Sequence, residues 1–279
     1  MPCGEISKKE CLECALEAAQ IGGKILKKYW GKLSKIESKG YSWDLVTEAD
    51  KESEKLVIAH LQSSFPEFGI LSEEVGMVQE NSEGYLWCLD PLDGTTNYTH
   101  QYPMVAVSIA LMYQGDPVVG VTYNPILGEL FQATKGEGAF LNGEKIHVSQ
   151  VKTLGESLLV TGFPYDRRTQ RETNYREFCY LTHLTQGVRR GGSAALDLAY
   201  VAAGRLDGYW ERGLQPWDIA AGILLVREAG GKVTSYDNSA VEIPTGRLLA
   251  TNGEIHEALS QAVLEAKHKP LAGSDHEET

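Results

Sequence analysis

The order of helical and strand-like patterns constrains this fold more than any other feature of the sequence. Two helical patterns open the chain, and short strand-like segments with hairpin turn signals follow as far as residue 141. From residue 158 onward, strands and helices alternate. This change of pattern predicts an α/β protein of the α+β type, with an antiparallel sheet in the first half and a smaller mixed sheet in the second.

The first half is predicted to contain two helices and a strand meander. The helices begin with capping boxes at Ser7 and Thr47, and the second helix ends before Pro66. The polar stretch 34–43 between the helices is typical of a loop or a mobile hairpin. Strands are predicted at residues 69–72, 85–89, 104–113, 118–123, 129–134 and 139–141.

The second half is predicted to alternate between strands and helices. Strands are expected at 158–161, 188–190, 206–210, 232–236 and 248–251, and helices at 173–184, 194–203, 217–229 and 254–267. A boundary near 149–153 divides the chain into domains 1–150 and 151–268. The polar residues 269–279 are expected to form a disordered tail.

The composition excludes several classes of protein. The 279 residues carry 26 Lys+Arg and 38 Asp+Glu, a net charge of −12, which gives no general attraction for nucleic acid or anionic lipid. No apolar run approaches the roughly 18 residues of a membrane span, and the N-terminus lacks a signal-peptide core. Cys11 and Cys14 lie inside a helical pattern and are interpreted as small buried side chains. We therefore expect a cytoplasmic protein.

The most informative segment is an apolar strand, 85–89, that leads directly into Asp90 and Asp93. Carboxylate oxygens are ligands that Mg²⁺ prefers. Two metals about 3.5–4 Å apart can hold both the attacking and the leaving oxygen of a phosphoryl transfer. Gly94 permits close backbone approach, and a helix that starts at Thr95 would point free N–H groups at an anion. The alternative is an ordinary surface turn.

Three further acids have two possible roles on spacing alone. Glu73 follows the strand 69–72 and could reach the same sheet edge as the acidic pair. Asp218 lies in the first turn of a helix, where the helix dipole alone would favour it. Asp50 completes the capping box of Thr47. Each of these acids is either part of the site or only structural.

Together, these segments resemble the inositol monophosphatase family of Mg²⁺-dependent sugar phosphatases over nearly the whole chain. The matching segments are Asp90-Pro91-Leu92-Asp93-Gly94-Thr95-Thr96-Asn97-Tyr98, Trp217-Asp218-Ile219-Ala220-Ala221-Gly222, Glu228-Ala229-Gly230-Gly231, Ser72-Glu73-Glu74 and Gly191-Gly192-Ser193-Ala194-Ala195. Ser72 stands where the family pattern has Gly. The resemblance implies a layered αβαβα sandwich in which the first domain holds most metal ligands.

The resemblance also implies roles for individual residues. Two or three Mg²⁺ ions would bind, the first to Glu73, Asp90 and the Leu92 carbonyl, and the second to Asp90, Asp93 and Asp218. Thr95, with Asp50 behind its hydroxyl and Glu73 on the metal side, would orient and deprotonate the attacking water. The amides of Gly94, Thr95 and Thr96 would receive the phosphate. Asp93, Ser193, Ala194 and Glu211 would face the polyol, and Lys39 would lie in a mobile loop.

The implied reaction is hydrolysis of inositol 1-phosphate, or a related polyol or sugar phosphate, by in-line attack of a metal-bound water. Fructose 1,6-bisphosphate, histidinol phosphate and 3′-phosphoadenosine 5′-phosphate are alternative substrates, and a non-catalytic interaction protein is a further alternative. Family membership would also imply a homodimer and sensitivity to Li⁺. A cluster of arginines could receive a second phosphate or form a solvated loop: Arg167, Arg168 and Arg171.

Overall fold

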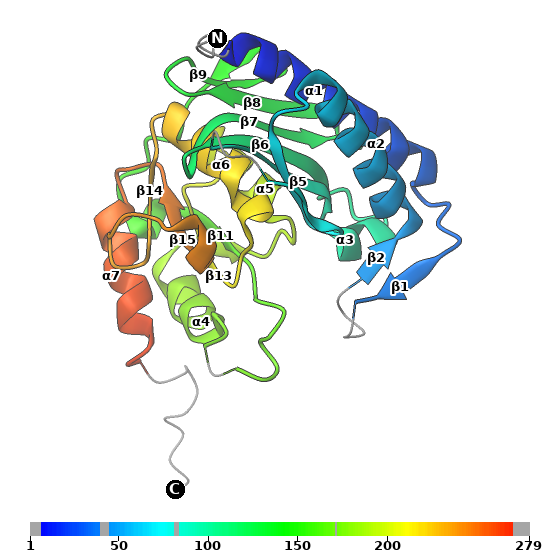
Figure 1. Cartoon of the computed structure of the whole chain (residues 1–279). Coiled ribbons are helices and arrows are strands. Elements are labelled where there is room, and N and C mark those ends of the chain that lie inside the picture. The colour runs from blue at the N-terminus through cyan, green and yellow to red at the C-terminus, as the bar shows by residue number, and fades with distance from the viewer. Residues whose placement is uncertain (1–6, 40–44, 81–83, 171, 270–279) are drawn as a thin grey trace, which may run out of the picture.

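The computed structural model describes residues 7–39, 45–80, 84–170 and 172–269. Helices and sheets alternate in layers, as predicted (Figure 1). The outer helices α1 (Lys8–Tyr29) and α2 (Glu48–Ser64) pack on one face of a large sheet. Helices α5 (Ala194–Ala202) and α6 (Pro216–Glu228) lie between the two sheets. Helices α4 (Tyr175–Leu184) and α7 (His256–Ala266) pack on the smaller sheet.

The large sheet has eight strands in the order β10-β9-β8-β7-β6-β5-β3-β4. Its strands are β3 (Gly69–Ser72), β4 (Gly76–Gln79), β5 (Tyr85–Asp93), β6 (Ala106–Tyr113), β7 (Asp116–Asn124), β8 (Glu129–Thr134), β9 (Gly138–Leu141) and β10 (Glu144–Ile146). Neighbouring strands are antiparallel except β3 and β5, which run parallel. Strands β4 and β10 were not predicted, because both lie at the edges of the sheet and neither has a buried side chain that would show as an apolar run.

The smaller sheet is mixed, as predicted, with strand order β12-β11-β13-β15-β14. Its strands are β11 (Leu158–Thr161), β12 (Gly187–Arg189), β13 (Gly208–Arg212), β14 (Lys232–Thr234) and β15 (Arg247–Thr251). The predicted boundary near 149–153 falls between the last strand of the large sheet and the first strand of the smaller one, and the division into domains stays a prediction. Of the predicted tail, residues 270–279 lie outside the described part of the chain.

The segment between the first two helices contains strand β1 (Ile36–Ser38), inside the polar stretch 34–43, and strand β2 (Leu45–Thr47), just after it, and the two pair antiparallel. This pairing agrees with the hairpin alternative, while residues 40–44 lie outside the description. Within the described ranges, the remaining helical elements are three short ones: α3 (Thr95–Thr99), η1 (Leu154–Glu156) and η2 (Ile243–Thr245).

Small residues allow helix α6 to pack tightly between the sheets. A Cβ added to Gly120 of β7 would lie 2.9 Å from the Ala221 carbonyl oxygen, and one added to Gly222 would lie 2.5 Å from Leu198. This close packing fixes the middle of α6 against the large sheet and against α5. On the other face of that sheet, Cys11 and Cys14 are buried in α1, which confirms their interpretation as small core side chains.

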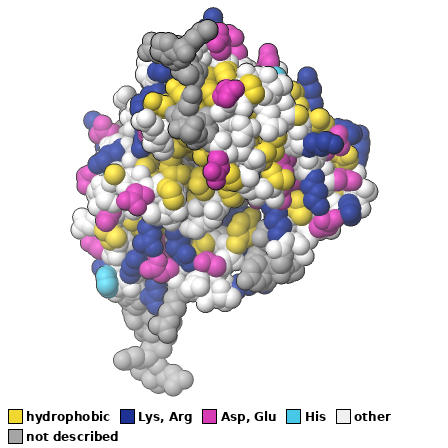
Figure 2. Space-filling model, in the orientation of Figure 1, with side chains coloured by type: hydrophobic (Ala, Val, Ile, Leu, Met, Phe, Trp, Pro, Cys, Tyr) yellow, Lys and Arg dark blue, Asp and Glu magenta, His cyan; other side chains and the backbone are white. Residues whose placement is uncertain are grey.

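The surface carries mixed charge. Figure 2 shows acidic and basic side chains interspersed with apolar ones across one face of the molecule. Among the described residues, no helix is both long and apolar enough to cross a membrane.

Candidate active site

The site begins where strands β3 and β5 end at the same edge of the large sheet. Parallel pairing places Ser72 opposite Leu89, and the Glu73 N–H donates to the Leu89 carbonyl at 3.1 Å. Glu73 therefore lies beside Asp90. The register of β5 against β6 shifts between Asp90 and Asp93, which marks a β-bulge. The predicted strand 85–89 thus continues through the acidic pair, and the bulge redirects its last residues.

The first turn of α2 supports the threonine that follows this strand. Asp50 is fully buried, and its Oδ2 accepts hydrogen bonds from the Thr47 amide at 2.8 Å and the Thr47 hydroxyl at 2.5 Å. Its Oδ1 accepts a hydrogen bond from the Thr95 hydroxyl at 3.1 Å. The Thr95 hydroxyl also lies 3.2 Å from the Leu92 carbonyl oxygen. The predicted pairing of Asp50 with Thr95 is therefore present.

Gly94 makes the turn from β5 into α3. Its φ of 93° lies in the left-handed region, and a Cβ at this position would lie 2.8 Å from the Met104 carbonyl oxygen. The turn therefore requires glycine on both conformational and steric grounds. Thr96, in the first turn of α3, is exposed.

The second half of the chain contributes the starts of helices α5 and α6. Asp93 Oδ2 accepts hydrogen bonds from the Ser193 hydroxyl and the Ala195 amide, both at 2.7 Å. Asp218 Oδ2 accepts from the Gln215 amide at 2.7 Å, which caps α6. The Ser108 hydroxyl of β6 donates to the Trp217 carbonyl at 3.2 Å and ties this helix start to the large sheet. The site is therefore assembled from both halves.

The acids of this site raise one another's pKa. Burial, followed by the charges of Glu73, Asp93 and Asp218, holds the pKa of Asp90 well above its usual range. Burial also raises the pKa of Asp93 to about 6 and that of Asp50 to about 6. The pKa of Asp218 is raised well above its usual range, first by burial and then by Asp93.

This donor set fits a hard cation. Buried like charges disfavour their own ionised forms, and a bound cation would offset both the burial and the mutual repulsion. Within the described ranges, no three Asp, Glu, His or Cys side chains form a ready-made metal cage. The Lys39 ammonium instead contacts Glu73 Oε1 at 2.8 Å and Glu74 Oε1 at 2.5 Å. Lys39 thus places a positive charge at the edge of the site.

Glu54 is a supporting residue that sequence reasoning missed. Its buried Oε1 accepts hydrogen bonds from the Ser72 hydroxyl, from the Glu74 amide at 3.0 Å and from the Val75 amide at 3.3 Å. These bonds fix the backbone on both sides of Glu73, and they give the Ser72 hydroxyl a partner. Glu54 lies four residues after Asp50 in α2, so helical spacing could have placed both acids on one face.

A cavity of about 90 Å³ lies next to the carboxylates. It brings together five predicted residues from separate segments: Asp93, Ser193, Ala194, Glu211 and Asp218. Glu211 is 8% exposed and its Oε2 accepts a hydrogen bond from the Tyr209 hydroxyl at 2.7 Å. Burial raises the pKa of Glu211 to about 7. Arg190 and Asp197 also line this cavity, although the sequence did not single them out.

The predicted arginine cluster is only partly placed. The Arg167 guanidinium donates to the Pro164 carbonyl at 3.2 Å, and Arg168 is exposed. Arg171 lies outside the described residues. Contact of this cluster with a second phosphate stays a prediction.

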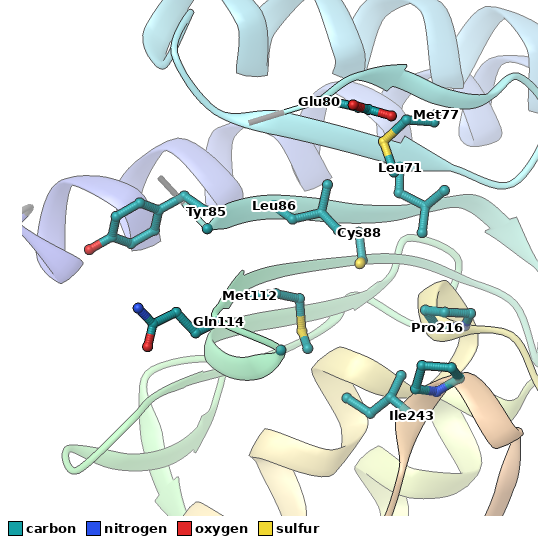
Figure 3. Close-up of a pocket in the computed structure, with 13 residues that line it drawn as sticks. Leu71, Met77, Glu80, Tyr85, Leu86, Cys88, Met112, Gln114, Pro216 and Ile243 are labelled. Carbon is teal, nitrogen blue, oxygen red and sulfur yellow. The ribbon is translucent and has the colours of Figure 1, made fainter. Parts of the chain in front are cut away.

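A second pocket, of about 510 Å³, has a lining that includes none of these acids; Figure 3 shows its side chains. Its lining is largely apolar, and Leu71, Leu86, Cys88, Met112 and Ile243 contribute side chains. A site for acid–base or metal chemistry needs convergent polar groups, and this lining offers few. The candidate active site is therefore the carboxylate cluster at the ends of β3 and β5.

The layered fold brings acids from both halves of the chain together beside the Thr95 hydroxyl, an arrangement that fits a hydrolytic enzyme. A model of the inositol monophosphatase family matches residues 7–268. The chain belongs to the inositol monophosphatase family and is a phosphatase. Members of this family generally depend on metal, and the family implies a small phosphorylated substrate.

Individual relatives match along most of the chain. Inositol-1-monophosphatase of Synechocystis sp. is 54% identical over 252 residues, which cover 90% of this chain and 88% of that protein. Nus factor SuhB of Pseudomonas aeruginosa is 43% identical over 253 residues, covering 89% and 93%. The structure of inositol monophosphatase from Anabaena (Nostoc) sp. superposes with a TM-score of 0.86 at 51% identity, covering 95% of this chain and 98% of that one.

Proposed function

We propose that this protein is a Mg²⁺-dependent phosphomonoester hydrolase that acts on inositol 1-phosphate or a related polyol phosphate. The observation that carries the proposal is the convergence of Glu73, Asp90, Asp93 and Asp218 beside the Thr95 hydroxyl. In this proposal, Glu73, Asp90 and the Leu92 carbonyl hold one ion, and Asp90, Asp93 and Asp218 hold another. Two or three ions bind in all. When bound, Mg²⁺ supplies positive charge for the phosphate and lowers the pKa of water.

The residues around Thr95 suit the orientation of a water molecule. A hydroxyl group has one proton to donate and two lone pairs that accept. Asp50 Oδ1 and the Leu92 carbonyl compete for that proton, so the Thr95 oxygen is left to accept a hydrogen bond from water. In this proposal, Glu73 acts from the metal side and completes the orientation. Asp50 thus acts as a positioning residue behind Thr95.

Hydrolysis then proceeds by direct in-line attack of the water oxygen on phosphorus. The new P–O bond forms as the ester P–O bond breaks, and a proton passes from the water to the alcohol product. The amides of Gly94, Thr95 and Thr96 receive the phosphate oxygens. Asp93, Ser193, Ala194 and Glu211 face the hydroxyl groups of the substrate. No covalent phosphoenzyme forms in this scheme.

The test is inorganic phosphate release in the presence of Mg²⁺. The four substrates are inositol 1-phosphate, fructose 1,6-bisphosphate, histidinol phosphate and 3′-phosphoadenosine 5′-phosphate. We expect the highest kcat/KM for inositol 1-phosphate. A preference for another substrate would keep the hydrolysis but reject the polyol assignment. No release from any of them would favour a non-catalytic interaction protein, and calorimetry with Mg²⁺ alone would then show whether the acids still bind metal.

Three further properties belong to this proposal. We expect inhibition by Li⁺, a homodimer in solution and a cytoplasmic location. Phosphate release with added Li⁺ and light scattering from the purified protein test the first two.

A further inference from the structure

Asn174 is a buried asparagine whose side chain joins two distant segments. It is 2% exposed and stands just before α4, where an asparagine commonly caps its own helix. Its side chain makes no capping hydrogen bond to α4. The amide nitrogen instead donates to the Gly162 carbonyl at 3.1 Å, and the amide oxygen accepts from the Tyr236 hydroxyl at 3.2 Å. The side chain therefore acts outside its own helix.

Gly162 begins one wall of the cavity of about 90 Å³. It follows β11, and residues 162–165 all line the cavity that Asp93 also lines. A Cβ on Gly162 would lie 2.0 Å from Glu211 Oε2, and Gly162 has no positive φ, so glycine is needed here for steric reasons. The backbone at Gly162 therefore sets how close this wall lies to the Glu211 carboxyl group.

The Asn174 amide is the main side-chain donor to the Gly162 carbonyl. The Thr161 hydroxyl also lies 3.3 Å from that oxygen, but it makes a shorter bond to the Trp210 carbonyl. A hydroxyl group has one proton to donate, so the Thr161 proton is used by Trp210. The neighbouring hydroxyl therefore does not replace the bond that Asn174 supplies.

The residue after Gly162 is held against the same helix start by packing. The Phe163 ring packs against Tyr175 and Phe178 of α4, with ring centroids 4.8 Å and 5.6 Å apart. Asn174 directly precedes Tyr175. The bond from Asn174 to Gly162 and the ring contacts of Phe163 thus fix one piece of the cavity wall against the start of α4.

We propose that Asn174 is a positioning residue for substrate recognition, which holds residues 162–165 as the wall that faces the non-reacting end of the substrate. The inference rests on the proposed function, because it concerns the hydroxyl-bearing part of a polyol phosphate. Asn174 lies behind the wall and does not itself line the cavity. The Thr95 hydroxyl is held by Asp50 and Leu92, and the bond from Asn174 to Gly162 takes no part in that support. Loss of this bond should therefore weaken binding of the substrate ring and spare the reaction at phosphorus.

The experiment compares inositol 1-phosphate with glycerol 2-phosphate, a smaller and acyclic ester, in the wild type and in Asn174→Gly. Asn174 has a φ of 62°, a left-handed conformation that glycine adopts without strain, so the substitution removes the side chain and keeps the backbone. We expect KM for inositol 1-phosphate to rise about tenfold, with kcat within about twofold and KM for glycerol 2-phosphate nearly unchanged. Unchanged constants, an equal rise in KM for both esters or a fall in kcat alone would overturn the inference.

Two further variants keep this test decisive. Tyr236→Phe removes the hydroxyl that donates to the Asn174 amide oxygen, so KM for inositol 1-phosphate should rise about threefold. If Asn174→Gly does not fold, an unchanged KM in Tyr236→Phe overturns the inference. The matched control is Asn142→Gly. Asn142 has a φ of 50°, and its side chain bonds the Gly128 carbonyl at 3.1 Å and the Leu130 amide at 2.9 Å. It does not line the cavity, so both KM values should stay unchanged.

The two proposals fail in different ways. If the wild type releases phosphate from neither ester, the proposed function is wrong and the inference falls with it. If the wild type is active on both esters and Asn174→Gly keeps both KM values, only the inference is wrong.

Discussion

Helices α2 and α6 begin in the same way but present their acids differently. Each has an acid at the third helical position, Asp50 in α2 and Asp218 in α6, that accepts from the backbone amide of its N-cap residue. Asp50 is fully buried, and both its oxygens accept hydrogen bonds, from Thr47 and from Thr95. Asp218 is only partly buried, and among the described residues only the Gln215 amide donates to it.

The difference shows that an acid at the third position of a helix can have either of two roles. An acid whose oxygens are both occupied by protein donors holds its neighbours in place. An acid with an oxygen left over can bind a ligand. In this molecule the α2 acid orients Thr95, and the α6 acid faces the cavity beside Asp93.

The strongest test of this comparison is Asp218→Asn. The amide oxygen can still accept from Gln215, so we expect the helix cap and the thermal unfolding temperature to be nearly unchanged. Phosphate release should fall about a thousandfold, because the proposed ligand of the second ion would lose its charge. Asp93→Asn should behave similarly in the activity assay. Wild-type activity in either variant would contradict the metal assignment.

Asp50→Asn should give the contrasting result. The side-chain amide nitrogen of the asparagine cannot accept a hydrogen bond from the Thr95 hydroxyl, so we expect kcat to fall about a hundredfold. Mg²⁺ affinity, measured by calorimetry, should stay near the wild-type value because Asp50 binds no ion in the proposed arrangement. The comparison between the two helices fails if Asp50→Asn loses Mg²⁺ binding as completely as Asp218→Asn does.

A third helix start, that of α7, carries a buried histidine instead of an acid. His256 lies between the hydroxyls of Thr234 and Thr251, each 2.8 Å from a ring nitrogen, and burial lowers its pKa to about 4. The His256 imidazole of the unfolded chain is therefore protonated as the pH falls below about 6.5, whereas that of the folded chain stays neutral until about pH 4. Stability should be full above pH 6.5 and fall by about 2 kcal/mol between pH 6.5 and 5.

The matched control for this pH effect is His256→Gln, measured by urea unfolding over the same range. Buried acids such as Asp50 have raised pKa values and act with the opposite sign, since the folded protein takes up their proton first as the pH falls. The difference between wild type and variant isolates the histidine. Equal slopes for the two proteins would refute this assignment.

The smallest expected effect concerns the support of Glu73. Ser72→Ala removes the hydroxyl that donates to Glu54 and leaves the two backbone amides as partners of that carboxylate. We expect Mg²⁺ affinity to weaken about tenfold, as when other supporting residues of metal ligands are removed. Ser72→Gly carries the family's own residue and serves as the comparison. Affinity equal to wild type in Ser72→Ala would show that the backbone bonds suffice.

Local sequence patterns predicted most of the helices and strands. They missed the strand residues whose conformation depends on pairing with a neighbouring strand. The helices at 194–203 and 217–229 match α5 and α6 closely, because their caps and apolar spacing are local. Strands β4 and β10 were missed, and β5 was predicted to end at Leu89, although it continues to Asp93. Pairing with β6 and the bulge decide that last segment, and neither leaves a periodic signal.

The sequence by itself determined the acidic segment from Asp90 to Asp93, the helix caps at Thr47 and Pro216, and the family. These are short-range features, because a cap or a turn depends on residues within one helical turn of each other. Only the tertiary structure decided that Glu54 supports the backbone around Glu73, and that Asp197 lines the cavity with an Oδ1 that no described residue pairs with. Those roles depend on which oxygens are left unpaired after distant segments pack together.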